Sequence, residues 1–133
     1  MLKMQLRSGK IVDISLSNID KALALYRAVI NEAKKAKLDL TLANEDTVAS
    51  MLMKNSEAIL NILSSELVME CIKDCCDKVL YDKQRFSMDI FEDVKSRGDF
   101  FGVMLLVAVE NLRPFFTEIS SVFDAIASLA LQA

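Results

Sequence analysis

Three cysteines are the first residues of this 133-residue chain whose type and spacing point to chemistry: Cys71, Cys75 and Cys76. Cys71 and Cys75 are four residues apart, so a helix would place them one turn apart on the same apolar face, with Cys76 pointing elsewhere. A closed zinc site needs four ligands, mostly Cys and His, and the chain contains no histidine. We therefore interpret the cysteines as small buried side chains in a reducing cytosol, and predict neither a metal site nor a cofactor.

Four carboxylates form a second group of candidate reactive side chains: Asp89, Glu92, Asp93 and Asp99. Such a group could hold a metal ion or act as an acid–base pair. The same segment also carries four basic side chains: Lys83, Arg85, Lys95 and Arg97. A solvated surface with exchanging ion pairs therefore explains the carboxylates better than a site does.

Other catalytic arrangements are excluded by composition. Without histidine, the chain has no Ser-His or Cys-His nucleophile pair and no histidine general base. Three glycines, scattered at positions 9, 98 and 102, cannot build a phosphate-binding loop. The sequence therefore predicts that the protein is not an enzyme.

The segment that opens the chain predicts a β-hairpin over residues 1–15. In "LKMQLRSGKIVDISL" apolar residues alternate with polar ones on both sides of Ser8 and Gly9, and the glycine suits a left-handed turn position. Two strands alone are marginally stable in water. The hairpin should therefore lie on a helical body or pair with another copy of the chain.

The rest of the chain reads as helical, because it holds little glycine and a single proline. "SNIDKALALYRAVINEAKKAK" predicts a helix capped by Ser17 or Asn18. Its apolar residues at three- and four-residue spacing predict this buried stripe: Ile19, Leu23, Tyr26, Ile30 and Ala33. A second helical region should begin near Asn44. "SSELVMECIKDCCDKVLYD" predicts a further helix, buried through Leu67, Cys71, Cys75 and Val79, with Ile72 as an additional candidate.

A polar linker, "KQRFSMDIFEDVKSRGD", follows, in which Ser87 can cap a short helical turn that buries Ile90 and Phe91. Gly98 and Asp99 should end one element and cap a helix over residues 100–113. Pro114 suits the first turn of a last helix over residues 115–129. We predict one mainly α domain over residues 1–133, with the hairpin at 1–15 and a helical body at 17–131.

Charge and hydropathy limit the classes of partner. The net charge of −3 divides into +4 over residues 1–40 and −7 over residues 41–133, which disfavours nucleic acid. The run from Phe100 to Val109 contains nothing more polar than Gly102, but its ten residues are too few to span a membrane. We expect a soluble cytosolic protein that binds neither nucleic acid nor membrane.

The apolar run must then be covered by protein, because a helix that is apolar on all sides cannot face water. Two interpretations stay open for it: a central helix among its own neighbours, or a helix partly reserved for a partner. For the last helix we expect an exposed apolar face. The candidate residues for partner binding or self-association are Phe100, Phe101, Met104, Phe115, Phe116, Ile119, Phe123 and Ile126.

A longer stretch, "CIKDCCDKVLYDKQRFSMDIFEDVKSRGDFFGVMLLVAVENLRPFF", resembles the tail assembly chaperones of long-tailed bacteriophages. In that family a helix ending in a Cys/Leu/Tyr cluster precedes a turn, represented here by Phe91, Glu92, Arg97, Asp99 and Phe100. The helix after the turn has a motif that is represented here by Asn111, Leu112, Pro114, Phe115 and Phe116. The hairpin "LRSGKIVDI" is similar to the family's usual opening.

The resemblance implies a chaperone that binds the tape measure protein, a very long helical polypeptide, and keeps it soluble until tube subunits polymerise around it. It also implies a protein of the bacterial host's cytoplasm that is absent from the mature virion. Many family members have a short form, which this chain resembles, and a longer frameshifted form thought to recruit the tail tube protein.

The residues themselves are consistent with this function. A soluble helical protein with a surplus apolar face can cover the stripe of a helical polypeptide, and copies lined up on one ligand reinforce one another. The hairpin edge and the last helix are the expected contacts between copies in a homo-oligomer. The alternative is a small helical adaptor that dimerises through its C-terminal helices and binds another helical partner.

Overall fold

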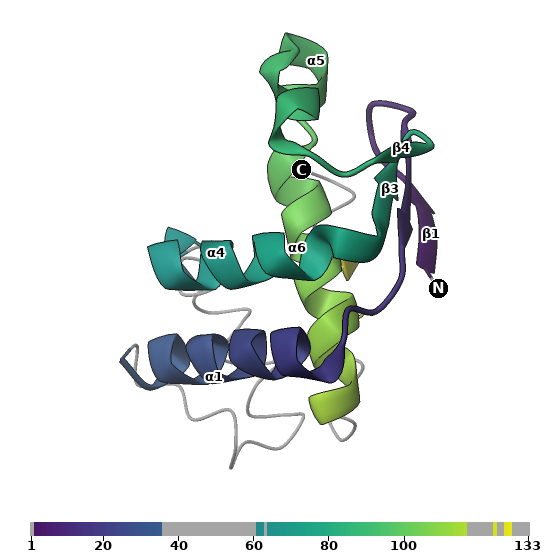
Figure 1. Cartoon of the computed structure of the whole chain (residues 1–133). Helices are drawn as coiled ribbons and strands as arrows, with labels where there is room; N and C mark the ends of the chain where they lie inside the picture. The colour runs from purple at the N-terminus through teal and green to yellow at the C-terminus, as the bar shows by residue number, and fades with distance from the viewer. Residues whose placement is uncertain (1, 36–60, 63, 117–123, 125–126, 129–133) are drawn as a thin grey trace.

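The computed structural model describes residues 2–35, 61–62, 64–116, 124 and 127–128 (Figure 1). Its strands are β1 (Leu2–Gln5), β2 (Ile11–Ile14), β3 (Val79–Tyr81) and β4 (Gln84–Arg85). Its α-helices are α1 (Ile19–Lys35), α4 (Glu66–Asp74), α5 (Val94–Arg97) and α6 (Phe100–Leu112). Three short 3₁₀ helices are η1 (Cys75–Lys78), η2 (Met88–Glu92) and η3 (Arg113–Phe115). The helical region predicted from Asn44 and most of the predicted last helix lie outside the described residues.

The predicted N-terminal hairpin is confirmed. β1 and β2 pair antiparallel, with Leu2 opposite Ile14 and Gln5 opposite Ile11. The Leu6 amide donates to the Lys10 carbonyl at 2.8 Å, which closes a three-residue turn. Gly9 takes the left-handed position in this turn, with φ of 94°.

The prediction of a mainly α domain with only a hairpin is wrong, because β3 and β4 extend the hairpin into a four-stranded antiparallel sheet in the order β1-β2-β3-β4. Residues 79–81, predicted to end a helix, form a strand whose side chains alternate between buried and exposed. Asp82 and Lys83, with φ of 51° and 68°, then make a tight two-residue turn. The fold is therefore a small mixed α/β structure.

Helix α1 begins as predicted, and its predicted stripe is confirmed in part, because Ile30 and Ala33 are buried. The Asn18 side chain accepts a hydrogen bond from the Lys21 amide at 3.0 Å, as a helix cap does. Ile19, predicted to be buried, is 65% exposed, whereas Leu25 and Val29 are buried. Because alanine and leucine alternate along this helix, two neighbouring stripes are both apolar, and spacing alone does not choose between them.

A similar shift occurs in α4. Leu67, predicted to be buried, is 58% exposed, and the next residue, Val68, lies in the core together with Ile72. The chain leaves the α-helix after Asp74 through η1, so Cys75 and Cys76 both turn inward. The prediction that Cys76 points away from the core is therefore wrong.

The centre of the fold is α6, which crosses both α1 and α4 in Figure 1. Nine of its thirteen residues are buried. Helices α1 and α4 pack on each other and on α6, and β2 contacts α6 as well. Of the two interpretations of the apolar run, the central helix is therefore the one that the structure supports.

Candidate functional site

The candidate residues on α6 fall into three environments. Met104 lies in the core, and Phe100 is half-buried. Phe101, in the first turn of the helix, is 66% exposed. Phe101 lies beside Phe100 and Met88, and a contiguous exposed apolar patch of this kind is a candidate surface for a partner.

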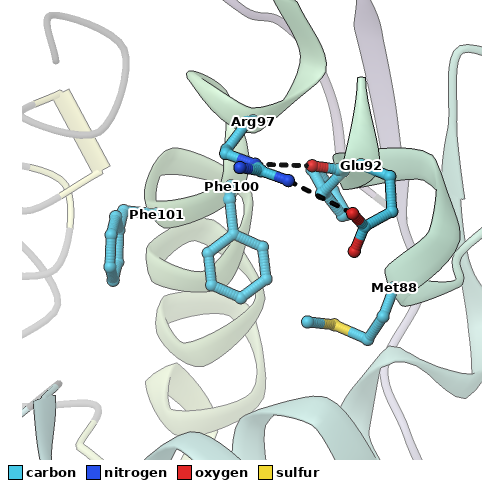
Figure 2. Close-up of a pocket in the computed structure, with 6 residues that line it drawn as sticks. Met88, Glu92, Arg97, Phe100 and Phe101 are labelled. Atoms are coloured by element: carbon cyan, nitrogen blue, oxygen red, sulfur yellow. Dashed lines mark hydrogen bonds and ion pairs between the residues drawn. The ribbon is translucent and has the colours of Figure 1, made fainter. Parts of the chain in front are cut away.

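Phe101 borders an open groove of about 210 Å³ (Figure 2). The groove is lined by Met88, Phe91, Glu92, Arg97, Phe100 and Phe101. Figure 2 shows the Phe100 ring between Phe101 on one side and Met88 on the other. These three side chains make an apolar strip, which we call the Phe101 strip. Met88 is 43% exposed and was not predicted from the sequence, because the segment around it was interpreted as a polar linker.

An ion pair lies beside the Phe101 strip. The Arg97 guanidinium contacts the Glu92 carboxylate at 3.2 Å, and its Nε donates to the Phe91 carbonyl at 3.1 Å. Both charged side chains are largely in solvent. The groove therefore combines an apolar floor with one positive and one negative group at its edge.

Local capping explains why the polar segment folds around this groove. As predicted, the Ser87 side chain caps η2 by accepting from the Asp89 amide, and η2 buries Phe91. Asp93 caps α5 in the same way through the Ser96 amide. The Phe91 ring then packs edge-on against Phe100 at a centroid distance of 5.2 Å. The interpretation of this segment as a linker is therefore wrong, because its polar residues cap short helices.

Asp99 departs most from its predicted role. We expected its side chain to cap α6, or to lie on a solvated surface with the other carboxylates. Instead it is buried and makes no side-chain cap. Its Oδ2 accepts hydrogen bonds from the Ser8 hydroxyl at 2.6 Å and the Tyr81 hydroxyl at 2.5 Å. The carboxylate thus ties the hairpin turn and β3 to the start of α6, a role that requires no substrate.

At the other end of α6, the aromatic candidates pack on α1. The Tyr26 ring lies 5.1 Å from Phe115 and 5.4 Å from Phe116, between ring centroids. Phe116 is buried and Phe115 half-buried. These two residues therefore belong mainly to the core. Ile119, Phe123 and Ile126 lie outside the described residues.

A buried amide was missed by the sequence analysis. Asn111 is 1% exposed in the middle of the apolar core. Its Oδ1 accepts from the Ser17 amide at 3.0 Å, and its Nδ2 donates to the Val107 carbonyl at 2.9 Å.

Nearby, the Lys21 ammonium and the Ser17 hydroxyl lower the pKa of Asp77, although partial burial alone would raise it. Both contacts fix the connection from β2 into α1.

The cysteines show the properties of core residues. Burial is the main cause that raises the pKa of Cys75 to about 11 and that of Cys76 to about 12, and it also raises the pKa of the half-buried Cys71. The Cys76 thiol donates to the Ile72 carbonyl at 3.3 Å. In the part of the chain that the structure describes, no three Cys, Asp or Glu side chains gather as a metal site.

These pKa values predict selective alkylation. In the folded protein near neutral pH, Cys75 should react with iodoacetamide at least about a hundredfold more slowly than an ordinary thiol, and Cys76 more slowly still, while Cys71 reacts first. Mass spectrometry of peptides after timed alkylation measures this, and the urea-unfolded chain, in which all three should react alike, is the control. Equal rates in the folded protein would contradict the burial of Cys75 and Cys76.

Comparisons with known proteins add nothing to this description, because no protein-family model, curated protein or solved structure matches the chain. Among the described helices, none is long and apolar enough to cross a membrane. The candidate site is therefore defined by its geometry: the Phe101 strip with the Arg97–Glu92 ion pair beside it.

Proposed function

We propose that this protein is a non-catalytic chaperone that covers the apolar stripe of a long helical polypeptide, the tape measure protein of a long-tailed phage, in the cytoplasm of the bacterial host. The observation that supports this most directly is the exposure of Phe101 on an otherwise buried helix, beside Phe100 and Met88. Covering one such aromatic side chain is worth roughly 1.5–3 kcal/mol.

The shape and polarity of the groove suit an amphipathic helix. Such a helix can lay its apolar side chains on the Phe101 strip, in the manner of helix-in-groove recognition. Charged residues that flank its stripe can then meet Arg97 and Glu92, which are exposed at the groove's edge. Because the groove offers one cation and one anion, it accepts stripes with either sign of flanking charge, which suits a ligand that presents many different segments.

The resemblance to tail assembly chaperones points to the same place. Four residues of the quoted motif are among the six that line the groove: Phe91, Glu92, Arg97 and Phe100. A fifth, Asp99, anchors the helix from which Phe100 and Phe101 project. The residues that carry the resemblance therefore build or support the candidate site.

A groove of this size binds weakly by itself. A long ligand compensates for this, because copies that are bound side by side raise one another's effective concentration. The proposal therefore includes self-association along the ligand, which is absent from the alternative of an adaptor that forms a fixed dimer. Light scattering over a wide dilution range, with and without the ligand, separates the two functions.

The substitution Phe101→Asp tests the groove. We expect it to weaken binding to the tape measure protein by a factor of about ten or more, because a buried carboxylate replaces a buried ring. The measurement is the fraction of tape measure protein that stays soluble on co-expression, supported by a pull-down titration.

Val94→Asp is the matched control. Val94 is 82% exposed at the start of α5 and does not line the groove. The Val94→Asp substitution introduces the same negative charge as Phe101→Asp, but outside the groove. It should therefore leave binding to the tape measure protein unchanged. Equal solubility of the tape measure protein with wild type and Phe101→Asp, both folded by circular dichroism, would refute the groove as the binding site.

A further inference from the structure

In the part of the chain that the structure describes, no strand pairs with the outer edge of β1, whose outward backbone groups could accept a further strand. The Leu6 amide bonds to Lys10, and the Ile11 carbonyl accepts from the Asp82 amide at 2.7 Å, which fixes the hydrogen-bonding pattern of the sheet. In an antiparallel pair, residues whose backbone groups face the partner strand alternate with residues whose groups face away. The backbone groups of Leu2 and Met4 therefore hydrogen-bond to β2, while the N–H and C=O groups of Lys3 and Gln5 point outward. Among the described strands, only β2 pairs with β1.

This edge lacks two of the usual devices that prevent strand addition, a bulge and a proline. Its four residues pair with β2 without a bulge, and none is proline. On its inner face, Leu2 and Met4 are only half-buried, although they belong to the rim of the core. Lys3 is the one charged residue in the strand, and its ammonium lies 3.8 Å from Asp13 of β2. A further strand would bury Leu2 and Met4 and satisfy the outward backbone groups.

We propose that the occupant of this edge is β1 of a second copy of the chain, antiparallel and in the register that sets Met4 opposite Met4. The choice of register rests on charge. Setting Lys3 opposite Lys3 opposes like charges, and a shift the other way sets Lys3 opposite Arg7. The Met4 register instead sets Lys3 opposite Gln5, so that the outward backbone groups of both residues bond across the two-fold axis, and the inner faces join Met4 to Met4.

The other edge of the sheet does not offer an equivalent partner. β4 has only two residues, and Gln84 pairs inward with Tyr81, which leaves Arg85 with outward backbone groups. Placing β1 of one copy on β4 of the next would bring Lys3 close to Arg85, a like-charge pair. The closed β1–β1 dimer, which forms an eight-stranded sheet, is therefore favoured over an open filament.

This dimer rests on the geometry of the sheet and not on the proposed function, because a closed dimer alone does not extend along a ligand. The two ideas fail separately. Loss of tape measure binding in Phe101→Asp concerns the groove at the start of α6, whereas dimerisation is measured on the protein alone.

Two opposite substitutions at one exposed position test the pairing. Gln5→Glu sets a carboxylate opposite Lys3 and should tighten the dimer, whereas Gln5→Lys sets a second ammonium there and should weaken it. Because the two-fold axis repeats each contact, we expect the dissociation constants to change about two- to twentyfold in opposite directions. Sedimentation equilibrium with an untagged N-terminus measures both.

Lys3→Pro removes the outward N–H and the exposed ion pair with Asp13 but no backbone hydrogen bond to β2, so it should leave the monomer folded and abolish the dimer. A wild type that stays monomeric at the highest concentration reached would overturn the proposal. So would equal dissociation constants for the two Gln5 variants. In either case the edge does not pair with a second copy, and a strand of a different protein becomes the occupant to test.

Crosslinking tests the register by itself. In a Cys71→Ser background, Met4→Cys places the introduced thiols directly opposite, about 4.5 Å apart between Cα atoms, within disulfide range. Lys3→Cys, the control, displaces them by about 7 Å along the strand and should not crosslink. Cys75 and Cys76 stay protonated and buried under mild oxidation. A disulfide-linked dimer from Lys3→Cys but not from Met4→Cys would overturn the register.

Discussion

Replacing Leu106 by alanine should destabilise the protein by about 3–4 kcal/mol, whereas replacing Phe101 by alanine should change the free energy of unfolding by less than about 0.5 kcal/mol. Both residues lie on α6, but Leu106 is fully buried between neighbouring elements and Phe101 faces solvent. Truncating Leu106 leaves a cavity that close-packed neighbours cannot fill. Truncating Phe101 exposes only the half-buried Phe100 ring, 5.4 Å away between centroids.

Urea unfolding followed by circular dichroism measures both changes, with the slope of the transition as a check that the unfolded state is unaltered. The pair of variants is informative because the sequence makes the two residues look equivalent, as large apolar side chains in one continuous run. A Phe101→Ala variant that unfolds as easily as Leu106→Ala would show that the ring is covered. That result would also remove the main support for the chaperone proposal.

The sequence predicted those elements whose signals are local. The N-terminal hairpin is marked by short-range alternation and by Gly9, and the start of α1 by Asn18. Strands β3 and β4 were missed because their signal is not local. Residues 79–81 are too few to establish a period of two, their turn contains no glycine, and their partner β2 is distant in sequence. Only the assembled sheet makes this segment extended.

The candidate site was predicted in part for a similar reason. Periodicity cannot orient a helix that is apolar on all sides, so Met104 and Phe101 were equal candidates, and the packing of neighbouring helices buried one and exposed the other. Met88 lies in η2, and the Ser87 cap of this short helix places it at the groove. The cap was predicted from the sequence, but the contact of Met88 with the groove was not. No local pattern in the sequence indicates that the Asp99 carboxylate would accept hydrogen bonds from Ser8 and Tyr81.

Asp99→Ala is expected to have an effect as large as that of the core truncation, about 3–5 kcal/mol. Each hydrogen bond to a charged group contributes roughly 1.5–3 kcal/mol, and the variant loses two at once. It also leaves the buried Tyr81 hydroxyl without this acceptor. Since domains of this size are stable by only about 5–15 kcal/mol, the variant should lose a large share of its stability and unfold at a clearly lower urea concentration.

A double-mutant cycle assigns this loss to the network. Tyr81→Phe removes one donor and keeps the ring, which packs against Phe91 at 5.4 Å between centroids. If the two groups bind each other, Asp99→Ala should cost about 1–3 kcal/mol less in the Tyr81→Phe background than in wild type. Additive costs would mean that the carboxylate and the hydroxyl do not interact in solution.

The network also has a signature in its pH dependence. Burial, followed by the hydrogen bond to the Asp99 carboxylate, raises the pKa of Tyr81 from an ordinary value of 10 to about 12. A pKa raised by folding means that the stabilisation is complete below pH 10 and is lost as the pH rises toward 12.

The raised pKa values of Cys75 and Cys76 act over a similar range, so the informative quantity is the difference between wild type and Tyr81→Phe. That difference should be constant from pH 7 to about 9 and shrink above pH 10. If the stability difference between wild type and Tyr81→Phe stayed constant up to pH 12, Tyr81 would have the same pKa in the folded and unfolded chains. The Asp99 carboxylate would then not stabilise the protonated Tyr81 hydroxyl.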